Sequence, residues 1–243
     1  MNAELEQEIR EEALDELEMY VESMDNANSF ANMTGIPSML SLLNDRSISI
    51  QTQAVWVLGT CLQSNTRFSE AFLNEHGLPP IVTRMQQTSD SGLASKIVYA
   101  LSGLLRSSDA AIVDAMALNT FDTLVDLLSA TNPSDLNLKR KLAFLFATLV
   151  FDKHSVNNLG HHLVEKKLLE ALVQDLKLND TDLQEKCINA LHALFSSCPA
   201  AVSHITNTTL QSALLEWSST AQFADNCEKT IAKQMLQMVG IGM

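Results

Sequence analysis

The amino-acid sequence predicts an all-α protein made of four similar units that follow one another along the chain. The first observation is a helical segment that shows the same pattern of apolar residues at Thr52–Ser64, Ser95–Ser107, Arg140–Asp152 and Glu185–Ser197. Aligned on Leu58, Leu101, Phe146 and Leu191, these copies follow one another at steps of 43, 45 and 45 residues. The chain has only 8 Gly and 5 Pro and no β-branched alternation, which favours helices over strands.

A second helical segment precedes each copy of the first and repeats with nearly the same period. Its copies begin at Gly35, Gly77, Thr120 and Lys167, and alignment on Leu40, Val82, Val125 and Val173 gives steps of 42, 43 and 48 residues. A period of about 40 to 47 residues with two or three helices per unit is typical of armadillo and HEAT repeats. Each unit buries only half of a core alone, so neighbours must stack and the end units must differ. We therefore expect an armadillo-like right-handed α-solenoid of about four repeats with atypical capping ends.

Within each repeat we expect a short first helix, a second helix and a long third helix. Gly35 and Gly77 follow two of the first helices, where a positive φ would allow a sharp turn. The larger step before the last repeat predicts a longer loop at Asp152–Gly160. The third helices, which we expect to line a concave face, are Thr52–Gln63, Ser95–Arg106, Leu138–Phe151 and Leu183–Ser196.

The two ends of the chain depart from the period. Residues 4–24 have apolar side chains at i, i+4 and i+8 and an acidic outer face, which predicts an amphipathic helix equivalent to the last helix of a truncated first unit. Asp25–Asn28 would end this helix and cap the next one. Leu210–Trp217 and Cys227–Gly240 predict two closing helices. We expect one continuous solenoid, with an N-terminal capping helix at 1–28, repeats at 29–205 and C-terminal capping helices at 206–243.

Charge and hydropathy exclude two classes of partner. The formal net charge is −13, so the average field repels nucleic acid and anionic membrane surfaces. The longest strongly apolar run, Leu142–Phe151, is about half of the roughly 20 residues that span a bilayer. We expect a monomer that binds neither nucleic acid nor membrane.

The sequence favours a reducing compartment. The first residues show no basic segment followed by an apolar one, so they do not resemble a secretory signal. Four cysteines lie in apolar helical settings, which indicates free buried thiols and a cytoplasmic protein. Sequons at Asn32, Asn179 and Asn207 point the other way, and the lumen of the endoplasmic reticulum remains the alternative if a signal peptide has been removed.

Catalytic and metal-binding patterns are missing from the sequence. It contains no nucleophile elbow, phosphate-binding loop, H-E-x-x-H or C-x-x-C, and adjacent His161 and His162 would point in different directions on a helix. We therefore expect no enzyme activity, no metal and no cofactor.

The concave surface of a solenoid is then the candidate site, because it is a large curved scaffold for another macromolecule. From helical phase we expect these third-helix side chains to be exposed and to bind the partner: Trp56, Lys96, Tyr99, Lys139, Arg140, Glu185 and His192. The alternative is structural, with Trp56 and Tyr99 in the core and Arg140 as a solvated cation.

Three segments carry a resemblance to a known family: VESMDNANSF at Val21–Phe30, AVWVLGTCLQSN at Ala54–Asn65 and YALSGLLR at Tyr99–Arg106. They resemble the armadillo-type nucleotide exchange factors of DnaK-type 70 kDa heat-shock chaperones. This HspBP-like family has cytosolic members and endoplasmic-reticulum relatives that serve BiP. The resemblance extends from about Glu11 to about Cys198.

The resemblance implies a co-chaperone that binds one chaperone molecule. Its concave face would embrace one lobe of the ATPase domain, displace the other lobe and so release ADP. Asp25, Asn26, Ala27 and Asn28 match the D-N-A-N contact region of the family, and Arg140 stands where the family has a basic residue. Ala27 would be exposed, because a small side chain lets the partner approach closely. Cytosolic members carry an N-terminal extension that helps to release substrate, whereas little precedes the first helix here.

Two other classes of function remain open from the residues alone. An armadillo adaptor that binds an extended peptide would need a ladder of Asn and Trp along successive third helices, and Trp56 and Asn189 are the only candidates. An enzyme would need a deep pocket that holds ionisable groups with perturbed pKa values.

Overall fold

The computed structural model describes residues 3–198, 212, 215 and 227–238, and these residues form helices, turns and loops without a strand. The chain divides into two compact units, Met1–Thr123 and Leu124–Met243. We call them unit 1 and unit 2 and describe each by itself. The expectation of one continuous body therefore stays a prediction. In the part of the chain that is described, no helix is long and apolar enough to span a bilayer.

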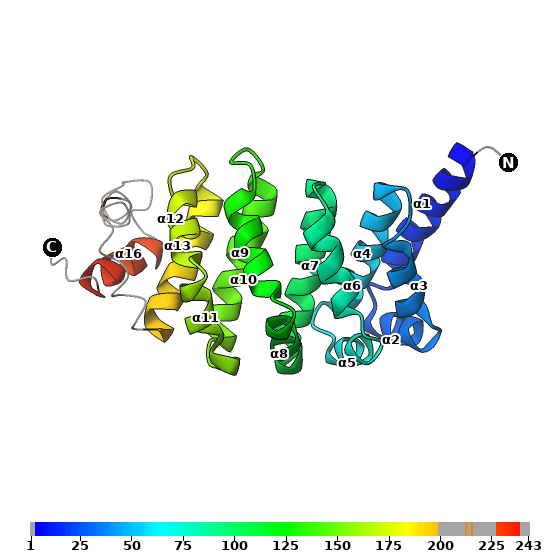
Figure 1. The fold of residues 1–243 in the computed structure, drawn as a ribbon, viewed down its shortest axis with the longest axis horizontal. Helices are drawn as coiled ribbons and strands as arrows, with labels where there is room; N and C mark the ends of the chain where they lie inside the picture. Colours follow the sequence, from blue (N-terminus) through cyan, green and yellow to red (C-terminus); the bar gives the residue numbers. More distant parts are fainter. Residues whose placement is uncertain (1–2, 199–211, 213–214, 216–226, 239–243) are drawn as a thin grey trace. The chain divides into compact units, whose positions relative to one another are not determined.

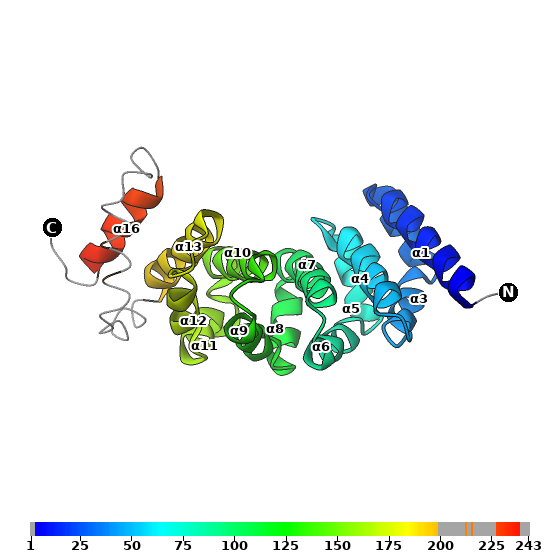
Figure 2. The same ribbon diagram turned by 90° about the horizontal axis from the view of Figure 1, so that it is seen from above.

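Unit 1 contains an N-terminal helix and two complete repeats. Its helices are α1 (Ala3–Tyr20), α2 (Met24–Asn32), α3 (Gly35–Leu42), α4 (Ile48–Leu62), α5 (Thr66–Asn74), α6 (Leu78–Gln87), α7 (Ser91–Ser107), α8 (Asp109–Ala117) and the start of α9 (Thr120–Ala130). Helices α1, α4 and α7 lie side by side in one layer, and α3 and α6 pack behind α4 and α7 (Figures 1 and 2). The layer therefore consists of the predicted third helices.

Unit 2 continues the same plan. After the end of α9, its helices are α10 (Leu136–Lys153), the 3₁₀ turn η1 (Val156–Asn158), α11 (Leu159–Glu165), α12 (Leu168–Asp175), α13 (Thr181–Ser197) and α16 (Cys227–Met238). The third helices α10 and α13 pack against each other, and α16 packs against α13. The extra residues before α11 contain η1, which confirms the predicted longer connection. The segment Leu210–Trp217 lies almost entirely outside the described residues.

Each third helix begins with the same capping contact. The side chains of Ser47, Asp90, Asp135 and Asp180 each accept a hydrogen bond from the backbone N–H three residues later. Such a cap satisfies one of the N–H groups that the first turn of a helix leaves without a partner. The caps stand 43, 45 and 45 residues apart, the same steps as the apolar core residues. The starts of the third helices thus recur with the same period as the apolar core residues.

The turn between the first and second helices differs from the prediction. A positive φ falls at the same aligned position of each repeat, six residues before Leu40, Val82, Val125 and Val173: Thr34, His76, Asn119 and Lys167. Gly77 has a φ of −71°, and Gly35 also lies outside the left-handed region. The expectation that the two glycines supply the positive φ is therefore wrong, because the residue before each glycine turns the chain.

The two glycines instead make room for aromatic rings. A Cβ atom on Gly35 would lie 2.4 Å from Phe30, and a Cβ atom on Gly77 would lie 2.4 Å from Phe72. Both rings come from the first helix of the same repeat. The third and fourth repeats have buried pairs without aromatic rings at these positions: Ala115 with Thr120 and Leu163 with Leu168. Glycine therefore occupies this position in the two repeats whose first helix places a phenylalanine ring against it.

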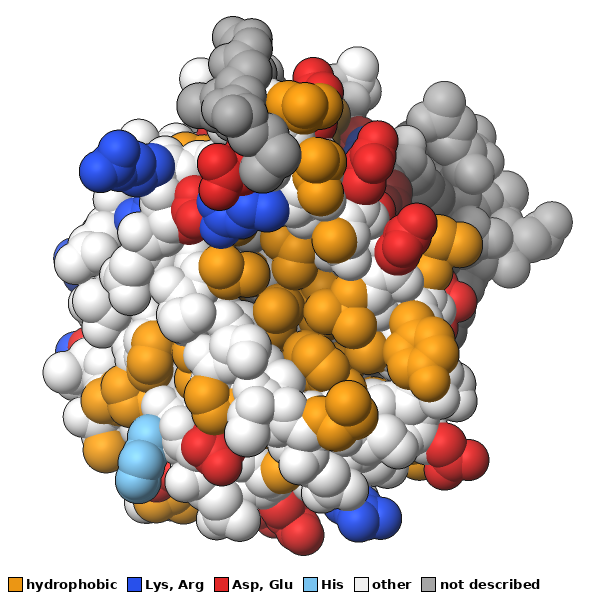
Figure 3. Space-filling view, turned by 90° about the vertical axis from the view of Figure 1, so that its right-hand side faces the viewer, with side chains coloured by type: hydrophobic (Ala, Val, Ile, Leu, Met, Phe, Trp, Pro, Cys, Tyr) orange, Lys and Arg blue, Asp and Glu red, His pale blue; other side chains and the backbone are white. Residues whose placement is uncertain are grey.

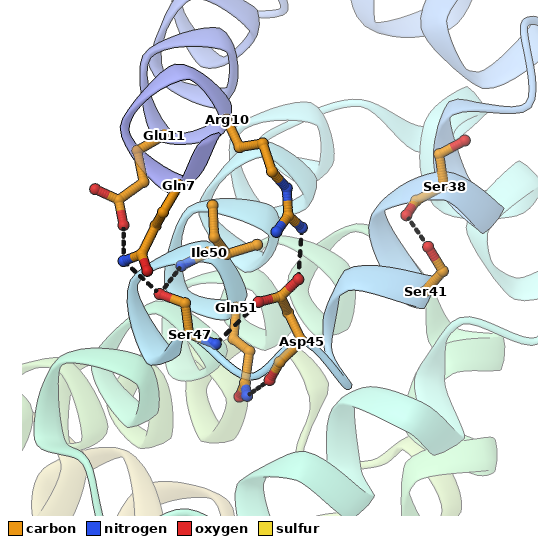
Figure 4. A network of polar contacts seen from close by, with 9 residues as sticks. All are labelled: Gln7, Arg10, Glu11, Ser38, Ser41, Asp45, Ser47, Ile50 and Gln51. Atoms are coloured by element: carbon orange, nitrogen blue, oxygen red, sulfur yellow. Dashed lines mark hydrogen bonds and ion pairs between the residues drawn. The ribbon is translucent and has the colours of Figure 1, made fainter. Parts of the chain in front are cut away.

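Side-chain contacts attach α1 to the first complete repeat (Figure 4). Arg10 of α1 pairs with Asp45, at 2.5 Å between Nη2 and Oδ2, and Gln7 donates to the Ser47 hydroxyl at 3.1 Å. The carbonyl of Asp45 also accepts a hydrogen bond from Gln51 of α4 at 2.6 Å. Helix α1 thus packs beside α4, whereas its role as the capping last helix of a truncated unit stays a prediction.

Three of the cysteines are buried thiols. Cys61, Cys187 and Cys198 are free and buried, as predicted. Burial raises the pKa of Cys61 to about 12 and also raises the pKa of Cys187. These thiols therefore stay protonated and pack as small apolar side chains.

Candidate protein-binding surface

The outer side of the layer formed by α1, α4 and α7 is a surface of polar and aromatic side chains. We call it the third-helix face of unit 1, and it consists of Asp15, Glu18, Gln53, Trp56, Thr60, Gln63, Lys96, Tyr99 and Arg106. Gln53 donates to Asp15 at 2.9 Å, and the Thr60 hydroxyl donates to Glu18 at 2.7 Å. These two contacts join α1 to α4. Most of these side chains are half-buried or exposed, so one side of each faces solvent. The hydrogen bonds fix the polar ends of those that form them.

Aromatic and cationic groups alternate where α4 meets α7. The Lys96 ammonium lies 3.1 Å from the centre of the Trp56 ring. Gln63 donates to the carbonyl of Tyr99 at 3.2 Å and accepts from Arg106 at 3.2 Å. Predicted site residues Trp56, Lys96 and Tyr99 are therefore brought together on one face, and each is half-buried.

Tyr99 is held closely against α4. Its Cδ1 atom would lie 2.7 Å from a Cβ atom on Gly59, so the glycine admits the ring. Burial raises the pKa of Tyr99, and a hydrogen bond with Thr60 opposes this shift. The phenol therefore remains a neutral group at physiological pH and can both donate and accept.

The third-helix face of unit 2 has a more apolar character. A pocket of about 350 Å³ lies between side chains of α10, α13 and α16, among them Phe144, Phe151, Lys186, Asn189, His192 and Ile231. Phe151 is 73% exposed and Phe144 is 42% exposed. Large aromatic side chains with this exposure are typical of surfaces that bind a protein.

Sequence reasoning found His192 here and missed the two phenylalanines. The position of Phe144 carries a signal, since the residues two places before the aligned core positions are Trp56, Tyr99, Phe144 and Asn189. Phe144 lies in the longest strongly apolar run of the chain, Leu142–Phe151, and the apolar character of that run gives no sign that this ring is exposed.

Arg140 is on the surface but has partners. Its side chain is 36% exposed and forms hydrogen bonds with Asp180, at 3.0 Å from Nε to Oδ1, and an ion pair with Asp182 at 3.4 Å. Asp180 is the main reason that the pKa of Arg140 is raised. Glu185 is exposed on α13. The exposure of Arg140 and of Glu185 agrees with the expectation from helical phase.

Lys139 does not belong to the surface. It is only 3% exposed, and its ammonium donates to Asp175 at 2.8 Å and to the carbonyl of Leu128 at 2.9 Å. The expectation that Lys139 is exposed is wrong, because α10 turns this position toward α9 and α12.

Solved structures with the same fold are designed armadillo repeat proteins. The designed protein YIII(Dq)4CqI has a TM-score of 0.77 at 14% identity, and the match covers 94% of this chain and 92% of the other. A second design, solved with a (KR)4 peptide, has a TM-score of 0.79 at 16% identity and covers 98% and 95%. These matches identify the fold as an all-α, armadillo-like solenoid.

A family model identifies the chain more narrowly. The SIL1/FES1/HPBP1 C-terminal domain matches residues 26–174, more than half of the chain. The chain belongs to the SIL1/FES1/HPBP1 family. A second model, nucleotide exchange factor Fes1, matches residues 1–30. The predicted resemblance is thereby confirmed.

Curated members of the SIL1/FES1/HPBP1 family are similar to this chain over different lengths. The Hsp70 nucleotide exchange factor FES1 of Mycosarcoma maydis is 35% identical over 147 residues, 60% of this chain and 37% of that protein. The corresponding protein of Schizosaccharomyces pombe is 25% identical over 213 residues, 86% and 72% of the two chains. Hsp70-binding protein 1 of Rattus norvegicus is 26% identical over 199 residues, 81% and 54%. The match thus spans little more than a third of the first relative.

The SIL1/FES1/HPBP1 match begins inside the D-N-A-N segment, whose structure differs from the prediction. Asp25–Asn28 lie within α2 and do not form a link between helices. Asn26 Nδ2 donates to the carbonyl of Tyr20 at 2.8 Å and so satisfies the end of α1. Ala27 is 1% exposed, so the expectation that it meets the partner directly is wrong: it packs inside the repeat. Asp25 is exposed and Asn28 is half-buried.

Proposed function

We propose that this chain is a co-chaperone that binds the ATPase domain of an Hsp70 chaperone and accelerates ADP release. The observation that carries this proposal is membership of the SIL1/FES1/HPBP1 family, whose curated relatives are named Hsp70 nucleotide exchange factors. The proposed complex contains one copy of each protein, and the proposed compartment is the cytoplasm. Because the Mycosarcoma maydis relative is matched over 37% of its length, the activity of the whole relative is part of the proposal.

The third-helix faces are the proposed contact surfaces. Trp56, Lys96 and Tyr99 form a preorganised cluster, because the Trp56–Lys96 contact and the close fit of Tyr99 on Gly59 limit their rotamers. Rigid aromatic side chains lose little conformational entropy on binding, which favours them as anchors. In unit 2 the proposed contacts are Arg140, Glu185 and His192. Lys139 and Ala27 are buried, so they are not proposed as contacts.

The mechanism would rest on coupling between two ligands of the chaperone. If this chain holds the ATPase domain in a form that binds ADP weakly, ADP must weaken the binding of this chain by the same factor. A typical coupling of about 1 to 3 kcal/mol corresponds to about 5- to 150-fold in each affinity. The chaperone supplies the nucleotide site, and this chain changes the occupancy of that site.

The test measures both sides of this coupling. Release of a fluorescent ADP analogue from an Hsp70 ATPase domain is followed with and without this protein, and the affinity of the two proteins is measured with and without ADP. We expect faster release and weaker binding in ADP. Trp56→Ala should weaken binding, whereas Val113→Ala, a change at an exposed apolar residue of α8, should not. Equal affinity with and without ADP would instead support the adaptor function.

A further inference from the structure

Helix α1 carries the same apolar row as the third helices of the complete repeats. Ile9, Ala13 and Leu17 stand 41 residues before Ile50, Ala54 and Leu58 of α4. In the four complete repeats the three positions of this row are at most 3% exposed: Ile50, Ala54, Leu58, Leu93, Ile97, Leu101, Leu138, Leu142, Phe146, Leu183, Cys187 and Leu191. The row is therefore a core element of every complete repeat.

In α1 the row is open to solvent. Ile9 is 50% exposed, and Leu5, one turn earlier, is 48% exposed. Ala13 is exposed and Leu17 is half-buried. Figure 3 shows hydrophobic side chains gathered across the end of unit 1 that contains α1 and α3. We call Leu5, Ile9, Ala13 and Leu17 the open row.

An adjoining side of α1 packs against α4 and the turn that precedes it. Leu14 is buried there, Arg10 pairs with Asp45, and Gln7 bonds to Ser47 (Figure 4). These contacts hold α1 in one rotation about its axis. The open row therefore stays on the surface when α1 packs.

A second helix packs on the third helix in complete repeats, as α3 does on α4 and α12 does on α13. The matching place on α1 is thus shaped for a helix. The charges beside the row are negative, since Glu6, Glu12 and Glu16 are exposed and follow the same side of the helix. We propose that the open row is a docking site for a cationic amphipathic helix of a partner protein.

The charge pattern decides between this partner and a second copy of the chain. Apolar residues at i, i+4 and i+8 on α1 would meet the apolar face of the incoming helix, and Lys or Arg beside that face would meet the glutamates. In a two-fold symmetric dimer, each α1 would bring its glutamates against the same glutamates. Like charges across an interface disfavour that arrangement.

The test uses two labelled model peptides of 18 residues, the length of α1. Both peptides have a leucine face at helical spacing, and they differ in carrying Lys or Glu beside that face. Fluorescence anisotropy should show binding of the Lys peptide and none of the Glu peptide. Ile9→Gln should weaken binding about tenfold, which corresponds to about 1.4 kcal/mol. Val113→Gln is the matched control, since Val113 is 47% exposed on another helix, and it should change nothing.

A second pair of variants isolates the charge. Glu12→Lys with Glu16→Lys should weaken binding of the Lys peptide, whereas Glu70→Lys with Glu75→Lys, at exposed positions of α5 and its end, should have a smaller effect. All four sites are exposed, so thermal unfolding should report folded variants. The proposal is overturned if the two peptides bind equally, if Ile9→Gln leaves binding unchanged, or if the Lys peptide does not bind. Sedimentation that shows a dimer lost in Ile9→Gln would assign the row to a second copy and also overturn it. None of these measurements uses Hsp70, so the result is independent of the proposed exchange activity.

Discussion

Lys139 and Asp175 form a buried ion pair in which Nζ lies 2.8 Å from Oδ1, and this contact has an equivalent with different chemistry in unit 1. The repeat alignment places Gln51 at the position of Lys139 and Arg84 at the position of Asp175. Gln51 Oε1 accepts a hydrogen bond from Arg84 Nε at 2.5 Å. In both units a long polar side chain of one repeat is therefore joined to the second helix of the next.

The first prediction concerns removal of one partner of the buried pair. Lys139→Met should destabilise the protein by about 3 to 5 kcal/mol, because it leaves the Asp175 carboxylate buried without its counterion. Lys139→Met with Asp175→Leu should recover much of this loss. Urea unfolding measures the free energies, and Lys177→Met, at an exposed lysine, should stay within about 0.5 kcal/mol of the parent.

The same variant has a pH signature. Burial already raises the pKa of Asp175, and Lys139 opposes that shift, so the pKa should rise further in Lys139→Met. The folded state then holds a proton that the unfolded state has lost, and stability falls as pH rises between the two pKa values. Lys139→Met should therefore regain stability on acidification toward 3.8, the ordinary value. A pH-independent loss would contradict a buried carboxylate as its cause.

The second prediction concerns the ion pair of Arg140 and Asp180. Arg140 is the main reason that the pKa of Asp180 is lowered from 3.8. A lowered carboxyl pKa gives stability that is present above the unfolded value and is lost as pH falls through the folded value. Arg140→Met should be less stable than the parent at neutral pH, and the difference should shrink as pH falls below 3.8. Urea unfolding across this range checks the prediction, which fails if the difference stays constant.

The third prediction tests the match between Phe72 and Gly77. Gly77→Thr should destabilise the protein by about 1 to 3 kcal/mol, because the new Cβ atom would overlap the ring. Phe72→Ala with Gly77→Thr copies the pair of the third repeat. The double variant should lose less stability than the sum of the single changes, with a coupling of about 0.5 to 3 kcal/mol. Gly92→Ala is the control, since its Cβ atom would meet only the Asp90 carboxylate at 3.2 Å. Additive losses would show that the two sites are independent.

The fourth prediction concerns the closing role of α16. Met235 and Leu236 are fully buried, and α16 packs against α13. Leu236→Lys should detach α16, expose the apolar side of α13 and promote aggregation, because a buried charge without a partner is unfavourable. Gln237→Lys places the same charge on the exposed side and should behave like the parent. Dye binding and light scattering compare the two, and equal behaviour would exclude a capping role for α16.

The fold was predictable because several independent features repeat at the same steps. Core residues such as Leu58 and caps such as Ser47 both recur at 43, 45 and 45 residues. Helix starts were less accurate: the third helix predicted at Ser95 begins at Ser91, one residue after the cap Asp90. Apolar periodicity marks the buried middle of a helix, whereas the cap marks its beginning.

The site was predictable only in part, because helical phase does not tell a buried polar residue from an exposed one. Lys139 and Arg140 are neighbours in the sequence, yet one is buried and the other is on the surface. Lys139 aligns with Gln51, another polar residue, so the alignment alone does not show that the position is buried. Ala27 carried no signal either, because a small apolar residue suits both a contact surface and a core. The aromatic row that ends in Phe144 needed the repeat alignment to be seen.

In three of the four repeats a side chain from the start of the third helix donates to a main-chain carbonyl at or just after the end of the second helix. Gln51, Lys139 and Gln184 donate to main-chain carbonyls of Asp45, Leu128 and Leu176, respectively, at 2.6, 2.9 and 3.0 Å. The second repeat has Ala94 at this position, and alanine has no side-chain donor. In native-state hydrogen exchange, local opening begins where fewest bonds must break. The junction between the second and third helices of the second repeat should therefore exchange its amide hydrogens faster than the matching junctions of the other three repeats.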